Sequence, residues 1–182
     1  PSILPVVTNT INLARIPDIP SQDIQFIGTD GADRIYVATL KGYVYVLSPQ
    51  GELLKTWRIE SYLQDMAVDE AGNVFVLEGS YIVRYDSDGN RLLKFANPQY
   101  ISFNDIAITS DGSVVSVARY TNPQTGKMAN GVFFFDAEGR QVRLIESILE
   151  KEIDVLDILS VDSIAVGPEG DLYVVEAGMR QI

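Results

Sequence analysis

The sequence predicts an all-β protein, a β-propeller built from four-stranded antiparallel blades, and three observations support this. A hairpin pattern recurs as "DMAVDEAGNVFVLE" from Asp65, "DIAITSDGSVVSVA" from Asp105 and "SIAVGPEGDLYVVE" from Ser163. Apolar residues alternate over four to six positions on either side of each turn, which is typical of strands. The pattern returns after about 40 residues, the usual length of a propeller blade.

Two kinds of glycine turn divide each repeat. The turns "DEAGN", "TSDGS" and "GPEGD" end a first strand, with the looser "TDGAD" in the first repeat, and "SPQGE", "DSDGN" and "DAEGR" join a third strand to a fourth. "DSDGN" resembles the start of a calcium-binding EF-hand loop, but no Glu stands at the twelfth position, so we interpret it as a hairpin turn. The turn glycines fall where a type I turn followed by a residue with positive φ is expected: Gly72, Gly89, Gly112, Gly139 and Gly170.

We expect a single propeller domain over residues 1–182, with about three and a half blades present. The predicted parts are an N-terminal closing segment (1–22), blade 1 (23–57), blade 2 (65–95), blade 3 (105–145) with an insertion at 119–131, a helical insertion (146–160) and a partial blade 4 (162–182). In the second insertion, Ser147 and Glu150 form a capping box before an amphipathic pattern. We prefer a helix packed on the blades to an acidic lid or docking helix.

A propeller has to close, because an open edge strand offers unpaired backbone groups to its neighbours. Three interpretations remain open. The chain is part of a six-bladed ring and lacks the C-terminal blades. Alternatively, the segment "LPVVTNTINLARI" (4–16) closes a four-bladed ring, or two copies of the chain complete each other. Separately, its first residue, Pro1 rather than Met, leads us to expect a processed or trimmed chain.

Composition limits the classes of function. The chain has 25 Asp and Glu against 14 Lys and Arg, for a net charge of −11. This balance argues against nucleic-acid binding, which depends on Lys and Arg contacts to phosphates. It has no His and no Cys, so the commonest general base and the thiolate nucleophiles are missing from these residues. No apolar run is long enough to span a bilayer.

The strand directions place both kinds of glycine turn on one face and the extra residues on the other, which we call the loop-rich face. Function is usually carried by loops on a rigid scaffold, so we expect a protein, peptide or glycan ligand to bind there. Exposed aromatic residues and Arg are typical interface anchors. The candidate binding residues are Tyr62 and Tyr100 in blade connections and Arg119 and Tyr120 at the mouth of the first insertion.

The starts of the inner strands hold the candidate metal ligands. Oxygen ligands from separate blades would suit Ca²⁺. We prefer the alternative in which each carboxylate accepts hydrogen bonds from backbone N–H groups of its own or the next blade and clamps the blades together. The candidates are Asp23, Asp65, Asn104, Asp105 and Asp162.

Two stretches, "DMAVDEAGNVFVLEGSYIVRYDSDGNRLLKF" (65–95) and "SIAVGPEGDLYVVEAGMRQI" (163–182), resemble NHL repeats. The family often shows Asp-x-x-Asn after the second strand, where this chain has Glu78-Gly79-Ser80-Tyr81 and Glu176-Ala177-Gly178-Met179. The resemblance implies a non-catalytic binding scaffold, commonly outside the cytoplasm. The alternative is a Ca²⁺-dependent hydrolase or lyase similar to the related lactonase-like propellers, in which Asp65 or Asp105 would have to act without a histidine.

Overall fold

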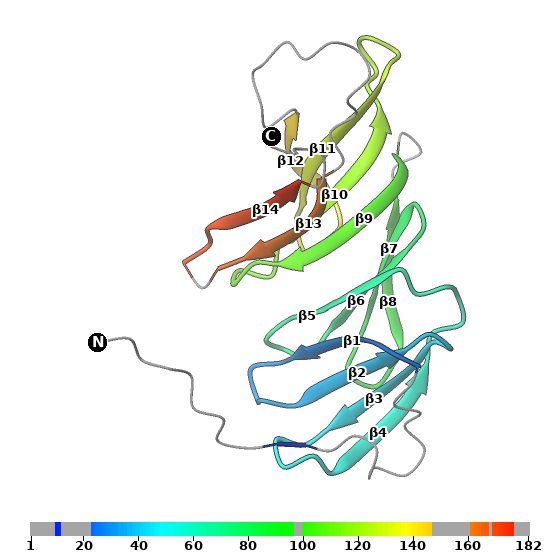
Figure 1. Cartoon of the computed structure of the whole chain (residues 1–182), viewed down its shortest axis with the longest axis vertical. Helices are drawn as coiled ribbons and strands as arrows, with labels where there is room; N and C mark the ends of the chain where they lie inside the picture. The colour runs from blue at the N-terminus through cyan, green and yellow to red at the C-terminus, as the bar shows by residue number, and fades with distance from the viewer. Residues whose placement is uncertain (1–9, 12–22, 97–99, 147–160, 168, 177–182) are drawn as a thin grey trace, which may run out of the picture.

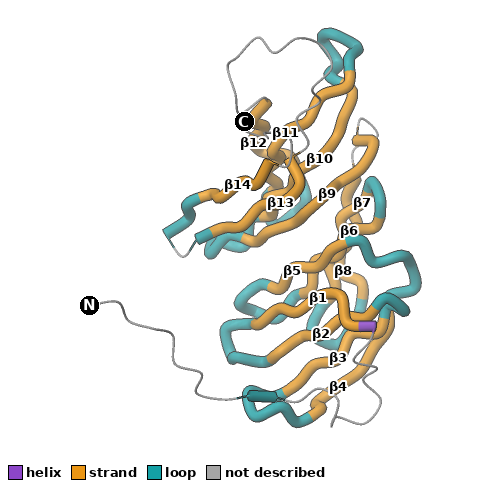
Figure 2. The backbone as a smooth tube through the Cα atoms, in the orientation of Figure 1, coloured by secondary structure: helices purple, strands orange, loops and turns teal. Residues whose placement is uncertain are grey.

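A computed structural model describes residues 10–11, 23–96, 100–146, 161–167 and 169–176. These residues form fourteen strands in four antiparallel sheets that follow one another along an arc (Figure 1). Figure 2 shows that loops and turns connect the strands, with one short helical turn beside β1. The predicted helical insertion lies outside the described residues, apart from Glu146 at the end of a strand. Among the described residues, no helix is long and apolar enough to cross a membrane.

Each of the first three sheets contains four strands in chain order, and the fourth sheet contains two. We call these sheets blades 1 to 4. Blade 1 contains β1 (Ile24–Thr29), β2 (Ile35–Thr39), β3 (Tyr43–Leu47) and β4 (Leu53–Arg58); blade 2 contains β5 (Asp65–Val68), β6 (Val74–Glu78), β7 (Tyr81–Tyr85) and β8 (Arg91–Ala96); blade 3 contains β9 (Tyr100–Ile108), β10 (Val114–Thr121), β11 (Met128–Phe135) and β12 (Gln141–Glu146); blade 4 contains β13 (Val161–Val166) and β14 (Leu172–Glu176).

The glycine turns form where the sequence predicts them. Gly72, Gly112 and Gly170 follow first strands with φ of 85°, 80° and 85°, and Gly89 and Gly139 follow third strands with φ of 83° and 78°. A side chain is strained in this region, so glycine is favoured. The looser first turn of blade 1 uses Asp33 at φ 57° instead.

The hydrophobic core lies between successive blades. Side chains of a strand alternate between the two faces of its sheet. In blades 1 to 3 both faces of the second strand are covered, and these strands are nearly continuous apolar runs. Each blade sends alternate residues of its second strand toward the next blade. The pairs in contact are Tyr36 and Ala38 with Val74 and Val76, Phe75 and Leu77 with Val114 and Ala118, and Val115 and Val117 with Leu172 and Val174.

Outer strands contact the glycine turn of the following blade. Trp57 at the end of β4 packs on Tyr85, with ring centroids 5.3 Å apart, and a Cβ added to Gly89 would lie 2.6 Å from its ring. Phe95 of β8 stands in the same relation to Gly139 of blade 3, also at 2.6 Å. Trp57 and Phe95 therefore pack at the boundaries between successive blades.

The insertion predicted at 119–131 is not a separate loop. β10 and β11 continue in register as far as Thr121 and Met128, and a short turn at Asn122–Lys127 joins them. β9 is lengthened as well and begins at Tyr100, because it pairs with the extended β10. The extra residues of blade 3 thus form a long three-stranded extension.

Candidate functional site

The inner strands of blades 2 and 3 begin with carboxylates that hold the next blade. Asp65 at the start of β5 accepts a hydrogen bond from the backbone N–H of Ile106 in blade 3, at 2.9 Å. Asp105 in β9 accepts one from Ile164 N–H in blade 4, at 2.7 Å. Each carboxylate therefore satisfies a backbone donor of its neighbour, which confirms the clamp hypothesis for Asp65 and Asp105.

The two carboxyl groups also meet each other. Ile106 N–H donates to Asp105 Oδ1 at 2.8 Å as well as to Asp65 Oδ2 at 2.9 Å. Burial, together with the hydrogen bond to Asp105 and its charge, raises the pKa of Asp65 to about 8. Burial opposes ionisation of Asp105 too, but hydrogen bonds from Asp65, from the Ser163 hydroxyl and from backbone N–H groups lower its pKa. The opposite directions of the two pKa shifts make Asp65 the partner that keeps a proton and Asp105 the one that ionises first.

The other members of the predicted ring do not join this pair as expected. Asp23 is not equivalent to Asp65, because the strand pairing places Phe26 at that position: Phe26 pairs with Ala38 as Asp65 pairs with Leu77. Asp23 instead forms an ion pair with Lys41 of its own blade, at 2.9 Å.

Two predicted ligands belong to the inner strands of blades 3 and 4. Asn104 precedes Asp105 in β9. Asp162 lies in β13, and its side chain is outside the described part of the structure; Ser163 occupies the position equivalent to Asp105. In the described ranges, no three acidic side chains gather in a way that could hold a metal ion. Both oxygens of Asp65 and both oxygens of Asp105 already accept backbone hydrogen bonds.

The predicted binding residues separate into exposed and buried positions. Tyr62 lies in the connection between blades 1 and 2 and is 74% exposed, and Arg119 is exposed on β10. Tyr120 is buried, with its ring edge-on to Phe133 at 5.2 Å, so the prediction of a surface anchor there is wrong. The alternation of the extended β10 turns Tyr120 inward. Tyr100 begins β9 rather than lying in a connection, and its side chain is outside the described part.

Two further tyrosines on the loop-rich face carry cations over their rings. Arg58 lies over Tyr43 at 5.4 Å in blade 1, and Lys94 lies over Tyr81 at 3.8 Å in blade 2. Both tyrosines open a third strand directly after the loop from the second strand. The two cations come from the fourth strands, Arg58 from β4 and Lys94 from β8.

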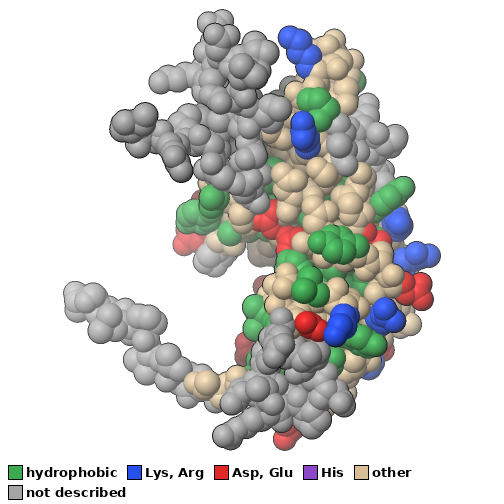
Figure 3. All heavy atoms as spheres, turned by 45° about the vertical axis from the view of Figure 1, so that its right-hand side comes forward, with side chains coloured by type: hydrophobic (Ala, Val, Ile, Leu, Met, Phe, Trp, Pro, Cys, Tyr) green, Lys and Arg blue, Asp and Glu red, His purple; other side chains and the backbone are tan. Residues whose placement is uncertain are grey.

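Hydrophobic and basic side chains alternate across this surface. Figure 3, which brings the right-hand side of Figure 1 forward, shows hydrophobic groups interleaved with Lys and Arg. Large exposed hydrophobic residues in the loops between second and third strands, or next to them, are Leu40, Tyr43, Tyr81 and Met128. Asp and Glu side chains lie among them in the same view. The glycine turns of the opposite face are also rich in Asp and Glu.

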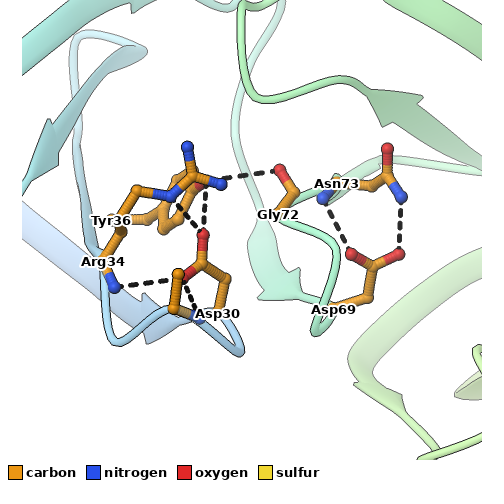
Figure 4. A network of polar contacts seen from close by, with 7 residues as sticks. Asp30, Arg34, Tyr36, Asp69, Gly72 and Asn73 are labelled. Atoms are coloured by element: carbon orange, nitrogen blue, oxygen red, sulfur yellow. Dashed lines mark hydrogen bonds and ion pairs between the residues drawn. The ribbon is translucent and has the colours of Figure 1, made fainter.

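An ion pair in the first turn of blade 1, with Asp30 buried and Arg34 partly exposed, belongs to a network that reaches blade 2 on the glycine-turn face (Figure 4). Asp30 accepts from Arg34 Nε at 2.6 Å and from the Tyr36 hydroxyl at 3.1 Å. The same hydroxyl lies 3.4 Å from the carbonyl oxygen of Gly72 in the next blade. Burial and the adjacent Asp30 carboxylate raise the pKa of Tyr36 to about 12. The network has the character of a structural link, since every polar group in it is directed at another part of the fold.

Comparison with known proteins supports the architecture. No protein-family model and no curated protein sequence matches the chain. Among solved structures, it is similar to the Neurospora crassa Pan2 WD40 domain (TM-score 0.59, 12% identity, covering 91% of this chain and 48% of that one). It is also similar to the Myceliophteria thermophila Cps50 (Swd1) β-propeller domain (TM-score 0.61, 16% identity, covering 89% of this chain and 55% of that one). A third similar structure is streptogramin B lyase (TM-score 0.53, 11% identity, covering 88% of this chain and 64% of that one).

The chain has a β-propeller fold. It spans about half the length of the first two structures that it matches. The sequence identities to them, 12% and 16%, show a shared fold alone. The predicted all-β class with four-stranded antiparallel blades is confirmed. The propeller neighbours include WD40 domains and a lyase, and they do not single out the NHL repeat.

Proposed function

We propose that this propeller is a non-catalytic binding scaffold that recognises a protein, peptide or glycan on its loop-rich face. The observation that carries the proposal is the set of exposed tyrosines there, Tyr43, Tyr62 and Tyr81, two of them with a cation over the ring. Tyrosine offers a large, rigid contact surface with a polar end, and a cation beside it adds a hydrogen-bond donor and charge. Such pairs suit both peptide and sugar surfaces.

The position of these side chains on the fold also supports the proposal. Tyr43 and Tyr81 each open a third strand that is held by continuous backbone pairing, whereas Tyr62 lies in the connection between these two blades. Aromatic residues on a rigid sheet lose little conformational freedom on binding, which favours affinity. Arg119 extends the same face onto blade 3 and is part of the proposed surface. We infer a partner outside the chain and, from the NHL resemblance, an extracytoplasmic setting.

The alternative of a Ca²⁺-dependent hydrolase or lyase has less support. It would need Asp65 and Asp105 as ligands or as acid and base, and backbone N–H groups engage both oxygens of each. Calorimetric titration of Ca²⁺ into chelator-treated protein tests this. We expect no saturable heat; saturable binding that Asp65→Asn and Asp105→Asn both abolish would favour the enzyme.

Binding to peptide and glycan arrays tests the proposed function. We expect the protein to bind a defined subset of ligands, and Tyr62→Ala with Tyr81→Ala to reduce that binding at least about tenfold, as for loss of interface anchors. The matched control is Lys55→Ala on β4, whose ion pair with Asp88 lies toward the glycine-turn face. Ligands that bind the double variant as well as the parent protein would contradict the proposal.

A further inference from the structure

Each of the first three blades presents a large apolar side chain at the start of its third strand, on the loop-rich face. These side chains are exposed to similar extents: Tyr43 by 37%, Tyr81 by 43% and Met128 by 43%. Leu40, in the loop before Tyr43, is 54% exposed. Exposed apolar residues that are scattered singly need no explanation, but here one recurs at the same place in three successive blades.

A cation stands beside each of these apolar residues. Arg58 lies over the Tyr43 ring and Lys94 over the Tyr81 ring, whereas Lys127 directly precedes Met128 in the chain. In the described parts of blades 1 to 3, the exposed cations of the loop-rich face are Lys41, Arg58, Lys94, Arg119 and Lys127. Apolar and basic side chains therefore alternate from blade to blade along this face.

Most of these cations are not neutralised by the chain itself. Within the described ranges, no ion pair involves Arg58, Arg119 or Lys127. The glycine-turn face differs, because Arg34 and Arg140 each form an ion pair with an Asp of their own turn, at 2.6 and 2.7 Å. Cations without a carboxylate partner on one face favour a ligand of the opposite charge.

The acidic side chains of the loop-rich face are mostly engaged or withdrawn from solvent. Asp65 and Asp105 accept backbone hydrogen bonds, and Asp23 forms its ion pair within blade 1. The Glu78 side chain is only 12% exposed. In the described parts of blades 1 to 3, Glu60 is the one carboxylate of this face that is well exposed. The cations therefore meet solvent with little competing negative charge.

The contacts of the two tyrosines favour a peptide among the possible anionic ligands. A cation already occupies one face of the Tyr43 ring and of the Tyr81 ring, which leaves less ring surface for a sugar or a base to stack on. The exposed Leu40 and Met128 side chains suit apolar side chains of a peptide, and methionine in particular adapts to varied partners. A long nucleic acid would also be repelled by the net charge of −11.

We propose, on the basis of the binding function proposed for this face, that its ligand is an acidic peptide segment of a partner protein, with apolar residues placed among its Asp and Glu residues. The carboxylates would accept hydrogen bonds from Arg58 and Lys94, which the tyrosine rings hold in place. The apolar side chains would pack against Tyr43, Tyr81 and Met128. Because the row of apolar and basic residues crosses three blades, it fits a chain segment better than a single charged group.

Binding to arrays of random linear peptides, glycans and single-stranded RNA tests the proposal. We expect the bound peptides to be enriched in Asp and Glu with Leu, Ile, Phe or Tyr between them, and we expect binding to weaken as the NaCl concentration rises. If only basic or neutral peptides, glycans or RNA bind, the acidic-peptide proposal is wrong but the binding scaffold stands. If nothing binds, both proposals are wrong.

Charge-removing variants locate the site on the chain. The probe is the tightest-binding acidic peptide from the array, labelled with fluorescein and followed by fluorescence anisotropy. Arg58→Gln combined with Lys94→Gln should weaken its binding at least about tenfold and flatten the salt dependence. Arg140→Gln, which removes a positive charge from the glycine-turn face, is the matched control and should change the affinity less than about twofold. Equal affinities of the double variant and the parent protein would overturn the proposal.

A variant with the opposite effect guards against loss of binding through misfolding. Glu60→Gln removes the exposed carboxylate from the loop-rich face, so it should strengthen binding of the same acidic peptide by about twofold at low salt. Circular dichroism should show all variants folded. Binding that is unchanged or weakened by Glu60→Gln would contradict an acidic ligand at this face.

Discussion

At the residue scale, the proton held between Asp65 and Asp105 makes stability depend on pH. The pKa of Asp65 is raised to about 8 in the fold, far above that of an exposed Asp. The folded state therefore binds a proton that the unfolded chain has lost above about pH 4. The stabilisation is complete below that pH and is lost as the pH rises toward 8, with a slope of at most about 1.4 kcal/mol per pH unit.

Asp65→Asn isolates this contribution. An amide at position 65 can still accept from Ile106 N–H and donate to Asp105 without titrating; it leaves Met66 N–H without its acceptor, a loss that does not depend on pH. We expect the variant to gain stability relative to the parent protein as the pH rises from 5 to 8, measured by urea unfolding at several pH values. Parallel pH profiles for the two proteins would show that Asp65 ionises normally.

Asp105→Asn is expected to behave differently. Asp105 accepts backbone hydrogen bonds at both oxygens, from Ile106 and from Ile164, and an amide can replace only one acceptor. The substitution should lower the free energy of unfolding by roughly 1–3 kcal/mol at any pH, the cost of a buried donor without a partner. An unchanged midpoint of urea unfolding would mean that the clamp to blade 4 contributes little.

The ion pair at Asp30 gives a second prediction for a single residue. Its side chain is fully buried and accepts from Arg34 and Tyr36. Asp30→Ala should cost on the order of 2–4 kcal/mol in thermal or urea unfolding, because it leaves buried donors without an acceptor. Asp136 and Arg140 form an ion pair with the same i,i+4 spacing in a turn of blade 3, at 2.7 Å, but Arg140 is exposed. Asp136→Ala is the matched control and should cost much less; equal losses would contradict the importance of burial.

At the scale of elements, the glycine turns serve two purposes that substitution can separate. Gly89 and Gly112 have nearly the same φ, 83° and 80°, but Trp57 lies against Gly89 whereas a Cβ at Gly112 would meet nothing within 4 Å. Gly112→Ala should cost only the backbone strain, about 1–2 kcal/mol. Gly89→Ala should cost clearly more in urea unfolding, since Trp57 must move. Equal losses in the free energy of unfolding would mean that the Trp57 side chain moves aside without a measurable cost.

The sequence was sufficient for elements whose signal is local. Alternating apolar runs and Asp-rich glycine turns locate the strands and hairpins, because turn chemistry and strand period act over a few residues. The clamp by Asp65 and Asp105 could also be predicted, as both residues open an inner strand. Their shared proton could not, since it depends on a distance across two blades.

The incorrect predictions, for Asp23 and Tyr120, came from strand registers that the sequence pattern did not show. Asp23 precedes its turn residue Asp30 by seven positions, whereas Asp65 precedes Asp69 by four, so only strand pairing shows that Phe26 takes the ring position. Tyr120 was expected in a loop because its repeat is longer than the others. In the structure the extra residues extend β10 and β11, and the alternation of the longer strand decides which side chains are buried.

At the scale of the whole molecule, the arc has contacts mainly between neighbouring blades, so its stability should vary along the chain. Blade 2 is covered on both faces, whereas the described part of blade 4 has two strands, with Tyr173 and Val175 exposed. We expect hydrogen exchange to be slowest in β6 and β7 and fastest in β14. Uniform protection would indicate one cooperative unit.

The position of Trp57 gives the molecule a built-in optical reporter. It is the one tryptophan in the chain, and it sits on the seam between blades 1 and 2, against Tyr85 and Gly89. Its indole nitrogen is buried, so its emission should be blue-shifted in the folded protein. A red shift that precedes the loss of β-sheet ellipticity on heating would record the separation of these two blades alone, which allows one seam of the propeller to be followed without any label.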